Sequence, residues 1–495
     1  MISIADFLKT IDCKYELLAC IDLSELTHQP DLAYKFFRDN WRQKYLLNQR
    51  LVIYTSQDIS TELLTHLYQA ANLSDVSNFF VLIVAALNSD TNHQICTTAS
   101  ADKVPFELVT ADLLPTKSLE NNFVLPSTIC PLPWMHLEID PAENVRPCCV
   151  YKGTVGNTND STLNALFNST TMQSLRQELA AGQKPSGCST CWTSEQQGFV
   201  SNRLRHLSFL KSELIDSFTN PVITSLDIKP GSVCNFKCRI CNSASSSAHA
   251  EEQHRYRMIP LKIYNWDQKS TALDQVSSIL DSLTNIDMYG GEPFLVKSLT
   301  QLIRDAIDKK YADKIRLHYN SNGSIWPGHL IPLWPHFKHV DIHFSIDSIG
   351  EKFELERGGS WSTVELNIRR LIDLKLPNLS ISIMPSVNIM NVYYLNDVYS
   401  WASQLGLPVR LNYVREPAAL SIENLTEKSK ELIISLYQDS QQPDLRNIAQ
   451  MVQNSVASNG NDFQKLIKEY DHMRLEDFTV THSEIASAMG YNHNT

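Results

Sequence analysis

Stretches typical of strands and helices alternate in a regular order through the second half of the chain. Six short segments rich in β-branched and aromatic residues predict strands, at residues 223–229, 285–290, 314–320, 339–347, 379–385 and 408–414. Helical segments lie between them; in residues 296–310, apolar side chains recur at helical spacing at Leu299, Leu302, Ile303, Ala306 and Ile307. This order predicts an α/β fold whose parallel strands are joined by right-handed helical crossovers.

The remaining sequence divides into three further regions. Residues 1–115 alternate strand-like segments (50–56 and the apolar run 79–87) with helix-like ones (31–47 and 60–73), which predicts a separate small α/β domain. Residues 123–200 hold short elements and five cysteines. Residues 221–420 form the regular α/β region, and residues 421–495 are mostly helical in pattern.

Composition and charge exclude several classes of protein. The 495 residues include 43 Lys and Arg against 54 Asp and Glu, a net charge of -11, which predicts no nucleic-acid partner. The first 23 residues lack the basic and apolar segments of a secretory signal, and the longest apolar run is far shorter than the ~20 residues that span a bilayer. We therefore expect a cytoplasmic protein with no membrane partner.

Eight of the eleven cysteines fall in three tight groups, at 130/148/149, 188/191 and 234/238/241. In a reducing compartment, clustered thiols are more often metal ligands than disulfides. Cys234, Cys238 and Cys241 have the spacing C-x3-C-x2-C in a loop that follows the first strand of the regular region. Loops at the carboxyl ends of parallel strands form the functional face of such sheets.

Three soft thiolates in this loop can hold one face of a [4Fe–4S] cube and leave the fourth iron open for a ligand. The alternatives are a zinc site completed by His249 or His254, and coincidence. Zinc favours paired C-x2-C groups and four protein ligands, and this loop contains one such pair.

The loop resembles that of radical S-adenosylmethionine (SAM) enzymes, whose C-x3-C-x2-C signature follows the first strand of a partial (β/α)6 TIM-like barrel. The resemblance implies that the open iron binds SAM, which reduction cleaves to methionine and a 5′-deoxyadenosyl radical that abstracts hydrogen. Cys234, Cys238 and Cys241 would then be both catalytic and metal-binding. The stretch MYGGEP after the second strand resembles the family motif that holds the methionine amine, which assigns Gly290, Gly291 and Glu292 to cofactor binding.

The same resemblance assigns four further residues to the cofactor. Asn322, Ser345 and Asp347 would line its ribose or methionine part, and Arg357 would face its carboxylate. Each of the four is also a common cap or turn residue.

The upstream cysteines resemble a shortened SPASM domain, the twitch domain, which carries an auxiliary [4Fe–4S] cluster. Cys130, Cys148, Cys188 and Cys191 would be its ligands, with Cys149 as a spare or a substitute for Cys148. Zinc satisfies the same number of thiolates. The stretch departs from the family at Glu143, where glycine is usual, and it precedes the barrel. Four cysteine ligands close the cluster and favour electron transfer over substrate binding.

The leading hypothesis is a radical SAM enzyme that acts on a peptide or protein side chain, with an electron donor such as flavodoxin or ferredoxin as a partner. Two alternatives remain: a sugar, nucleotide or other small metabolite as the substrate, and a non-catalytic iron–sulfur or zinc protein. Residues 1–115 could recognise a leader peptide, although their pattern is unlike a winged-helix recognition domain.

Overall fold

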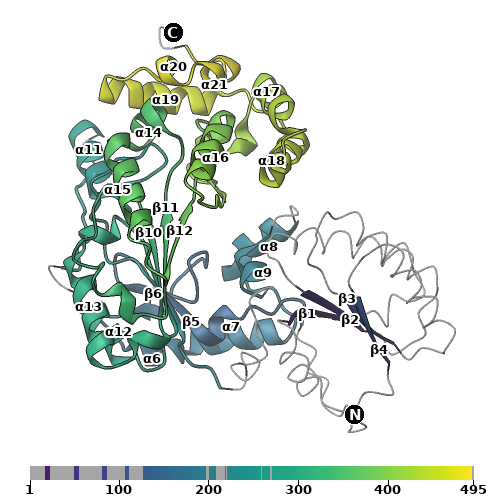
Figure 1. The fold of residues 1–495 in the computed structure, drawn as a ribbon, viewed down its shortest axis with the longest axis vertical. Helices are drawn as coiled ribbons and strands as arrows, with labels where there is room; N and C mark the ends of the chain where they lie inside the picture. Colours follow the sequence, from purple (N-terminus) through teal and green to yellow (C-terminus); the bar gives the residue numbers. More distant parts are fainter. Residues whose placement is uncertain are drawn as a thin grey trace. The chain divides into compact units, whose positions relative to one another are not determined.

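The computed structural model describes residues 126–196, 200–207, 218, 220–257, 259–267 and 270–492, together with the backbone of four strands nearer the N-terminus. The chain divides into two compact units. The first comprises Met1–Met135, Val150–Gly153 and Ser169–Val222, and the second comprises His136–Cys149, Thr154–Asn168 and Ile223–Thr495. The cysteine-rich stretch at 123–200 is therefore shared between the two units, both of which are drawn in Figure 1.

The second unit contains an eight-stranded sheet in the order β12-β11-β10-β9-β8-β5-β6-β7. Its strands are β5 (His136–Ile139), β6 (Asn144–Arg146), β7 (Gly156–Asn157), β8 (Ser225–Ile228), β9 (Asn285–Met288), β10 (Arg316–Ser321), β11 (His339–Phe344) and β12 (Leu379–Ile383). Neighbours from β12 to β5 are parallel, whereas β6 and β7 are antiparallel. This open, mostly parallel sheet confirms the predicted fold class, a partial TIM-like barrel.

Five of the six predicted strands, β8 to β12, lie in this sheet. The sixth prediction, 408–414, was wrong in extent: only β14 (Asn412–Tyr413) is a strand, and it pairs with β13 (Ser386–Val387). A single parallel bridge, Ile383 to Val409, joins that segment to β12. Backbone hydrogen bonds continue this pairing past Pro385, from the Arg410 N–H to the Ile383 oxygen and from the Asn412 N–H to the Pro385 oxygen. On the far side of the parallel strands, β5, from the cysteine-rich stretch, pairs with β8.

Helices connect the strands: α6 (Leu163–Phe167), α11 (Ser247–Arg257), α12 (Ala272–Ser278), α13 (Lys297–Asp308), α14 (Gly350–Arg357), α15 (Trp361–Asp373) and α16 (Leu395–Gln404). Short 3-10 turns are η5 (Pro293–Leu295), η6 (Ala312–Lys314), η7 (Trp334–His336), η8 (Val392–Tyr394), η9 (Ala418–Leu420) and η10 (Ile422–Asn424). The predicted apolar stripe of α13 is buried at Leu299, Leu302, Ile303 and Ala306. In Figure 1, α12, α13 and α15 lie along one side of the strands.

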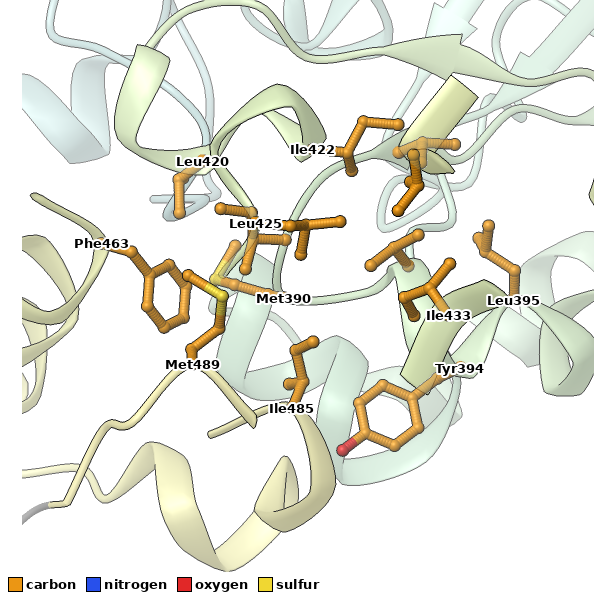
Figure 2. Close-up of a cluster of buried hydrophobic side chains, with 14 of the residues drawn as sticks. Met390, Tyr394, Leu395, Leu420, Ile422, Leu425, Ile433, Phe463, Ile485 and Met489 are labelled. Carbon is orange, nitrogen blue, oxygen red and sulfur yellow. The ribbon is translucent and has the colours of Figure 1, made fainter. Parts of the chain in front are cut away.

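The C-terminal region is helical, as its pattern predicted: α17 (Glu427–Tyr437), α18 (Pro443–Asn454), α19 (Asn461–Arg474), α20 (Phe478–Thr481) and α21 (Ser483–Ala488). These helices share one apolar core with the segments around β13 and β14. Figure 2 shows Met390, Leu425, Phe463 and Ile485 in that core. Ile240, from the three-cysteine loop, packs against it, so the C-terminal helices belong to the same body as the loop.

The first unit contains a four-stranded parallel sheet in the order β1 (Leu17–Asp22), β2 (Arg50–Tyr54), β3 (Val81–Ala85) and β4 (Phe106–Thr110). The strands predicted near 50–56 and 79–87 are thus confirmed, and the predicted helices between them lie outside the described residues. The unit continues with α5 (Leu132–Met135), α7 (Thr170–Ala180), η3 (Ser186–Cys188), α8 (Ser189–Gln196) and α9 (Asn202–Leu207). Across the described residues, none of the helices has the length and apolar character needed to cross a membrane.

Candidate active site

β8 ends at Ile228, and Cys234, the first cysteine of the loop, follows six residues later. Cys238 is buried, and Cys234 and Cys241 are partly buried. Burial raises the pKa of the Cys234 thiol to about 11 and that of Cys238 to about 12, and it also raises the pKa of Cys241. Thiols with such pKa values hold their protons at neutral pH unless a metal displaces them, so metal binding here releases protons.

A glycine turn after β9 packs directly against this loop. Gly291 has φ +60°, and a Cβ atom there would lie 2.3 Å from the carbonyl oxygen of Val233. The backbone N–H of Glu292 donates to the same Val233 oxygen at 2.8 Å, and that of Gly291 donates to Ser245 at 3.2 Å. Gly290 has φ +86° and a similarly close contact with Lys229. The two glycines therefore allow a backbone approach that a side chain would block.

Glu292 is fully buried, and both of its carboxylate oxygens accept hydrogen bonds. Oε2 accepts from the backbone N–H of Asn322 at 2.7 Å, and Oε1 accepts from Ser321 Oγ at 2.9 Å and from the N–H of Phe294 at 3.1 Å. Burial raises the pKa of Glu292 to about 7, and these three donors oppose that rise. The carboxylate is thereby held between the β9 and β10 ends of the sheet.

Asn322 brings the end of β10 to the first cysteine. Its Nδ2 lies 3.8 Å from Cys234 Sγ and donates to Asn235 Oδ1 at 3.1 Å. Ser345 follows β11, where its backbone N–H donates to the carbonyl oxygen of Ser321 at 2.9 Å. Both residues therefore lie at the carboxyl ends of the parallel strands, which form the rim of the barrel.

Arg357 and Asp347 meet at the second cysteine. Arg357 Nη1 lies 3.9 Å from Cys238 Sγ, and its Nη2 is 2.8 Å from Asp347 Oδ2. Burial alone would lower the pKa of Arg357, but the Asp347 carboxylate and the Cys238 sulfur raise it above its usual value. The second Asp347 oxygen accepts from the N–H of Ser386 at 2.7 Å. The ion pair thus fixes the guanidinium toward the sulfur.

These residues fit an iron–sulfur cluster. The loop offers soft sulfur donors, N–H groups of Asn322 and Arg357 point at two of the sulfurs, and hydrogen bonds to sulfur are one means by which proteins tune clusters. The histidines of the zinc alternative have other neighbours: His254 Nδ1 lies 2.8 Å from the Ile259 carbonyl oxygen, and His249 packs edge-on against Tyr470.

Three of the upstream cysteines lie together in the first unit. Cys130 and Cys191 are buried and Cys188 is half-buried, with Cys188 ending η3 and Cys191 in the first turn of α8. Burial raises the pKa of Cys130, and the neighbouring Cys188 and Cys191 raise it further. Burial likewise raises the pKa of Cys188 to about 12. These three thiols therefore interact electrostatically with one another.

Cys148 and Cys149 both lie in the second unit, but Cys149 has a distinct environment. Burial raises its pKa to about 12, the carboxylates of Asp227 and Glu138 add to the rise, and Lys229 opposes it. Cys149 therefore interacts with charged residues of the sheet.

Glu143, where the family usually has glycine, keeps a glycine-like backbone with φ +65°. Its side chain is buried, and Oε2 accepts from Thr158 Oγ1 at 2.5 Å and from Thr271 Oγ1 at 3.0 Å. The turn geometry is thus preserved, and the carboxylate joins the turn to the residue that precedes α12.

The strand register also reveals polar residues that the sequence analysis did not single out. Across neighbouring strands, Glu138 pairs with Asp227, Asp227 with Asp287, Asp287 with His318 and His318 with Asp341. We call these five residues the middle row. All five lie on one face of the sheet, because side chains alternate along a strand.

A second row lies two residues nearer the carboxyl ends of the strands, on the same face. This upper row consists of Lys229, Tyr289, Asn320, His343 and Ser382. On the opposite face the strands present fully buried apolar residues to the helices, such as Leu226, Leu317, Val340 and Ile342. The sheet therefore has an apolar face toward the helices and a polar face.

Charges on the polar face are closely coupled. Lys229 pairs with Glu138, and His136 Nε2 lies 3.4 Å from Asp227. Burial, and after it the Asp227 carboxylate, raise the pKa of Asp287 to about 8. Asp287 therefore holds its proton at neutral pH.

Two histidines of the polar face, His318 and His343, lie edge-on with ring centroids 4.2 Å apart. Burial and the neighbouring His318 lower the pKa of His343 to about 3, and burial also lowers the pKa of His318. Both rings are therefore neutral at physiological pH, when each can donate one hydrogen bond and accept another.

A sequence signal for this face existed. Parallel strands buried on both faces read as continuous apolar runs, whereas residues 285–290, 314–320 and 339–347 alternate polar and apolar positions. That alternation identifies one polar face, but the sequence alone does not set the register that aligns the rows.

Two protein-family models match the chain. Residues 228–398 match the radical SAM superfamily, and residues 130–192 match SPASM, an iron–sulfur cluster-binding domain. The chain contains a radical SAM domain and, before it, an auxiliary iron–sulfur domain. The radical SAM domain implies a [4Fe–4S] cluster and SAM, and the SPASM domain implies an auxiliary cluster. Membership of this superfamily supports an enzyme, in agreement with the leading hypothesis.

Solved structures show only distant similarity to this radical SAM protein. "Native anSMEcpe with bound AdoMet and Kp18Cys peptide" matches 48% of this chain at 19% identity and a TM-score of 0.34. "Structure of TYW1 with a lysine-pyruvate adduct bound" matches 47% at 14% identity and a TM-score of 0.26. The match spans 63% of the first of these chains, less than two thirds, and 72% of the second. None of the curated proteins compared with the chain matches it.

Proposed function

We propose that this protein reductively cleaves SAM and uses the resulting radical to abstract a hydrogen atom from a peptide or protein side chain. One observation carries the proposal: two loop cysteines each have an N–H donor from a different part of the barrel rim. Asn322 reaches Cys234 Sγ, and Arg357 reaches Cys238 Sγ. A structural metal site needs no such convergence of rim residues on its ligands.

The roles of the other rim residues follow from their positions. When bound, the cluster supplies the electron that cleaves SAM into methionine and a 5′-deoxyadenosyl radical. Glu292 lies beside the loop and can accept a hydrogen bond from the methionine ammonium group, while Gly290 and Gly291 let that group approach the backbone. Asp347 holds Arg357, which would face the SAM carboxylate, and Asn322 and Ser345 are available to the ribose or methionine part.

The polar face supports an extended substrate. The two rows together cross six strands, from β5 to β12, and strands in a sheet are ~4.8 Å apart, so the face is about 24 Å wide. That width matches about seven residues of extended peptide. Its neutral imidazoles, carboxylates and amide can pair with peptide N–H and C=O groups.

The auxiliary cluster has an electron-transfer role in this proposal. Cys130, Cys148, Cys188 and Cys191 would close it with four thiolates, which leaves no iron position for substrate. The cluster would accept an electron from the substrate radical. A flavodoxin or ferredoxin would supply the electron that starts each reaction.

The reaction is tested by anaerobic reconstitution with iron and sulfide, then addition of dithionite and SAM. We expect 5′-deoxyadenosine from the wild-type protein and none from Cys234→Ala. Cys96→Ala, which changes a cysteine outside the motifs, is the matched control and should retain the yield. An undiminished yield from Cys234→Ala would contradict the assignment.

Substrate class is tested by the stimulation of SAM cleavage. Pools of peptides of about seven residues or more and pools of sugars and nucleotides are added separately to the reconstituted protein. We expect peptides to raise the yield of 5′-deoxyadenosine and to carry the mass change. Stimulation by a small metabolite alone would replace the peptide proposal with the metabolite alternative.

A further inference from the structure

The arginine inside the three-cysteine motif is bound by two carboxylates of the C-terminal region. Arg239 is fully buried between Cys238 and Cys241. Its Nη2 lies 2.8 Å from Asp471 Oδ1 and 2.6 Å from Glu476 Oε2. A buried guanidinium is costly unless it is paired, and both of these partners lie more than 230 residues away in sequence. The loop conformation at Arg239 therefore depends on the C-terminal segment.

A second arginine, which belongs to the C-terminal segment itself, also binds the loop. Arg474, at the end of α19, donates from Nη2 to the backbone carbonyl oxygen of Lys237 at 2.6 Å. The same side chain forms two hydrogen bonds with Glu252 of α11, at 3.0 and 2.7 Å. The residues on both sides of Cys238 are thus bonded to residues of the C-terminal segment.

Asp471 joins these contacts to the rest of the segment. Besides Arg239, it accepts from the backbone N–H of Phe478 at 2.9 Å and from Tyr491 Oη at 2.8 Å. Asp471 is almost fully buried, so its carboxylate is shielded from water and its hydrogen bonds are strengthened. The Asp471 carboxylate therefore links Arg239 of the loop to Phe478 and Tyr491, within the segment 461–491.

The same segment also reaches α14, whose last residue is Arg357. His482 Nε2 lies 3.0 Å from Glu356 Oε1, and the Glu356 carbonyl oxygen accepts from the backbone N–H of Arg239 at 2.7 Å. Figure 1 shows α19, α20 and α21 in yellow beside α14. Two elements that meet at Cys238, the loop and α14, thus share one C-terminal support.

We propose that residues 461–491 set the geometry of the cluster loop at Cys238, with Arg239 and Asp471 as positioning residues. The inference deepens the proposed function and rests on it, because it concerns the loop that would hold the SAM-binding cluster. The C-terminal helices are then part of the cluster site.

A control ion pair joins α11 to α19, the two helices that Glu252 and Arg474 also join. Arg257 of α11 pairs with Glu469 of α19 at the surface, where both side chains are 43% exposed. Exposed ion pairs contribute little, so Arg257→Ala should leave the loop unchanged. Arg239→Met and Asp471→Asn each break the buried pair. Arg239→Lys keeps the positive charge and one donor nitrogen, so it should retain part of the wild-type behaviour.

Two measurements on the full-length chain test the inference. In the apo-protein, hydrogen exchange of the Arg239 amide should accelerate about tenfold in Arg239→Met and Asp471→Asn, and not in Arg257→Ala. After reconstitution, the electron paramagnetic resonance spectrum of the reduced cluster should respond to SAM in the wild type and the control, and lose or change that response in the two variants.

The outcomes distinguish this inference from the proposed function. If both variants match the control in exchange and in their SAM response, the positioning role is wrong. If the wild type binds no SAM-responsive cluster, the proposed function fails, while the exchange result still decides the contact between the segment and the loop. Should Arg239→Met not fold, Glu476→Gln removes only the second partner of Arg239, whose carboxylate is 29% exposed, and gives a milder loss of pairing.

Discussion

Glu143 adopts a backbone conformation that residues with side chains rarely occupy. Its φ of +65° is left-handed, and its carboxylate accepts hydrogen bonds from Thr158 and Thr271. A left-handed non-glycine residue costs ~1 kcal/mol, which the buried hydrogen bonds offset. A glycine would avoid the strain and lose those bonds.

Comparison of Glu143→Gly with Glu143→Ala isolates the backbone strain. Both variants lose the carboxylate, so both should be less stable than the wild type by about 1–3 kcal/mol. The alanine variant should be the less stable of the two by about 1 kcal/mol, because only glycine adopts this φ freely. Denaturant midpoints measured under identical conditions test this. Equal midpoints for the two variants would refute the strain argument.

Asp287 makes stability depend on pH. Its pKa of about 8 in the fold exceeds the ~3.9 of an unfolded Asp, so between these values the folded state binds about one more proton. The free energy of unfolding from this group therefore falls as pH rises from 4 to 8.

Asp287→Asn should remove that fall, a change in slope of about one proton per molecule. Unfolding of the apo-protein between pH 5 and pH 8 measures it. Asp341→Asn removes another carboxylate of the middle row, which is paired with Arg316, and serves as the control. Identical slopes for wild type and Asp287→Asn would contradict the raised pKa of Asp287.

At the scale of the elements, the turn after β9 can pack against the cysteine loop only because Gly291 has no side chain. A Cβ on Gly291 would lie 2.3 Å from the Val233 oxygen, whereas Gly350 has the same type of φ, +61°, with nothing within 4 Å of its would-be Cβ. Comparison of the two glycines therefore separates the effect of steric contact from that of backbone conformation.

Gly291→Ala should therefore displace the cysteine loop, and Gly350→Ala should not. We expect Gly350→Ala to cost about 1 kcal/mol of stability with unchanged iron content. Gly291→Ala should cost about 1–3 kcal/mol more and lose the iron bound by the loop. Iron analysis and denaturant midpoints of both variants give the result, and full iron content in Gly291→Ala would exclude the steric argument.

For the whole molecule, the proposed clusters set an iron count. Two cubane clusters give about eight irons per chain. Cys188→Ala removes one predicted auxiliary ligand, so iron should fall toward about four while 5′-deoxyadenosine formation continues and substrate product is lost. This separation follows because the predicted ligands of the SAM-binding cluster, Cys234, Cys238 and Cys241, do not include Cys188.

Cys149→Ala provides the comparison. Cys149 interacts with Asp227, Glu138 and Lys229. Its removal should leave about eight irons. If Cys149→Ala lowers the iron content and Cys148→Ala does not, the ligand assignment must be reversed.

The sequence by itself determined the α/β class, five parallel strands of the sheet and the chemistry of the cysteine loop. Strand alternation and the spacing of Cys234, Cys238 and Cys241 are local features, and local spacing survives in any fold that keeps the loop after a strand. The tertiary structure alone decided what depends on pairing between distant segments. The addition of β5 to the sheet, the alignment of Asp227 with Asp287, and the burial of Arg239 against Asp471 require register and packing between residues far apart in the sequence, which no local pattern encodes.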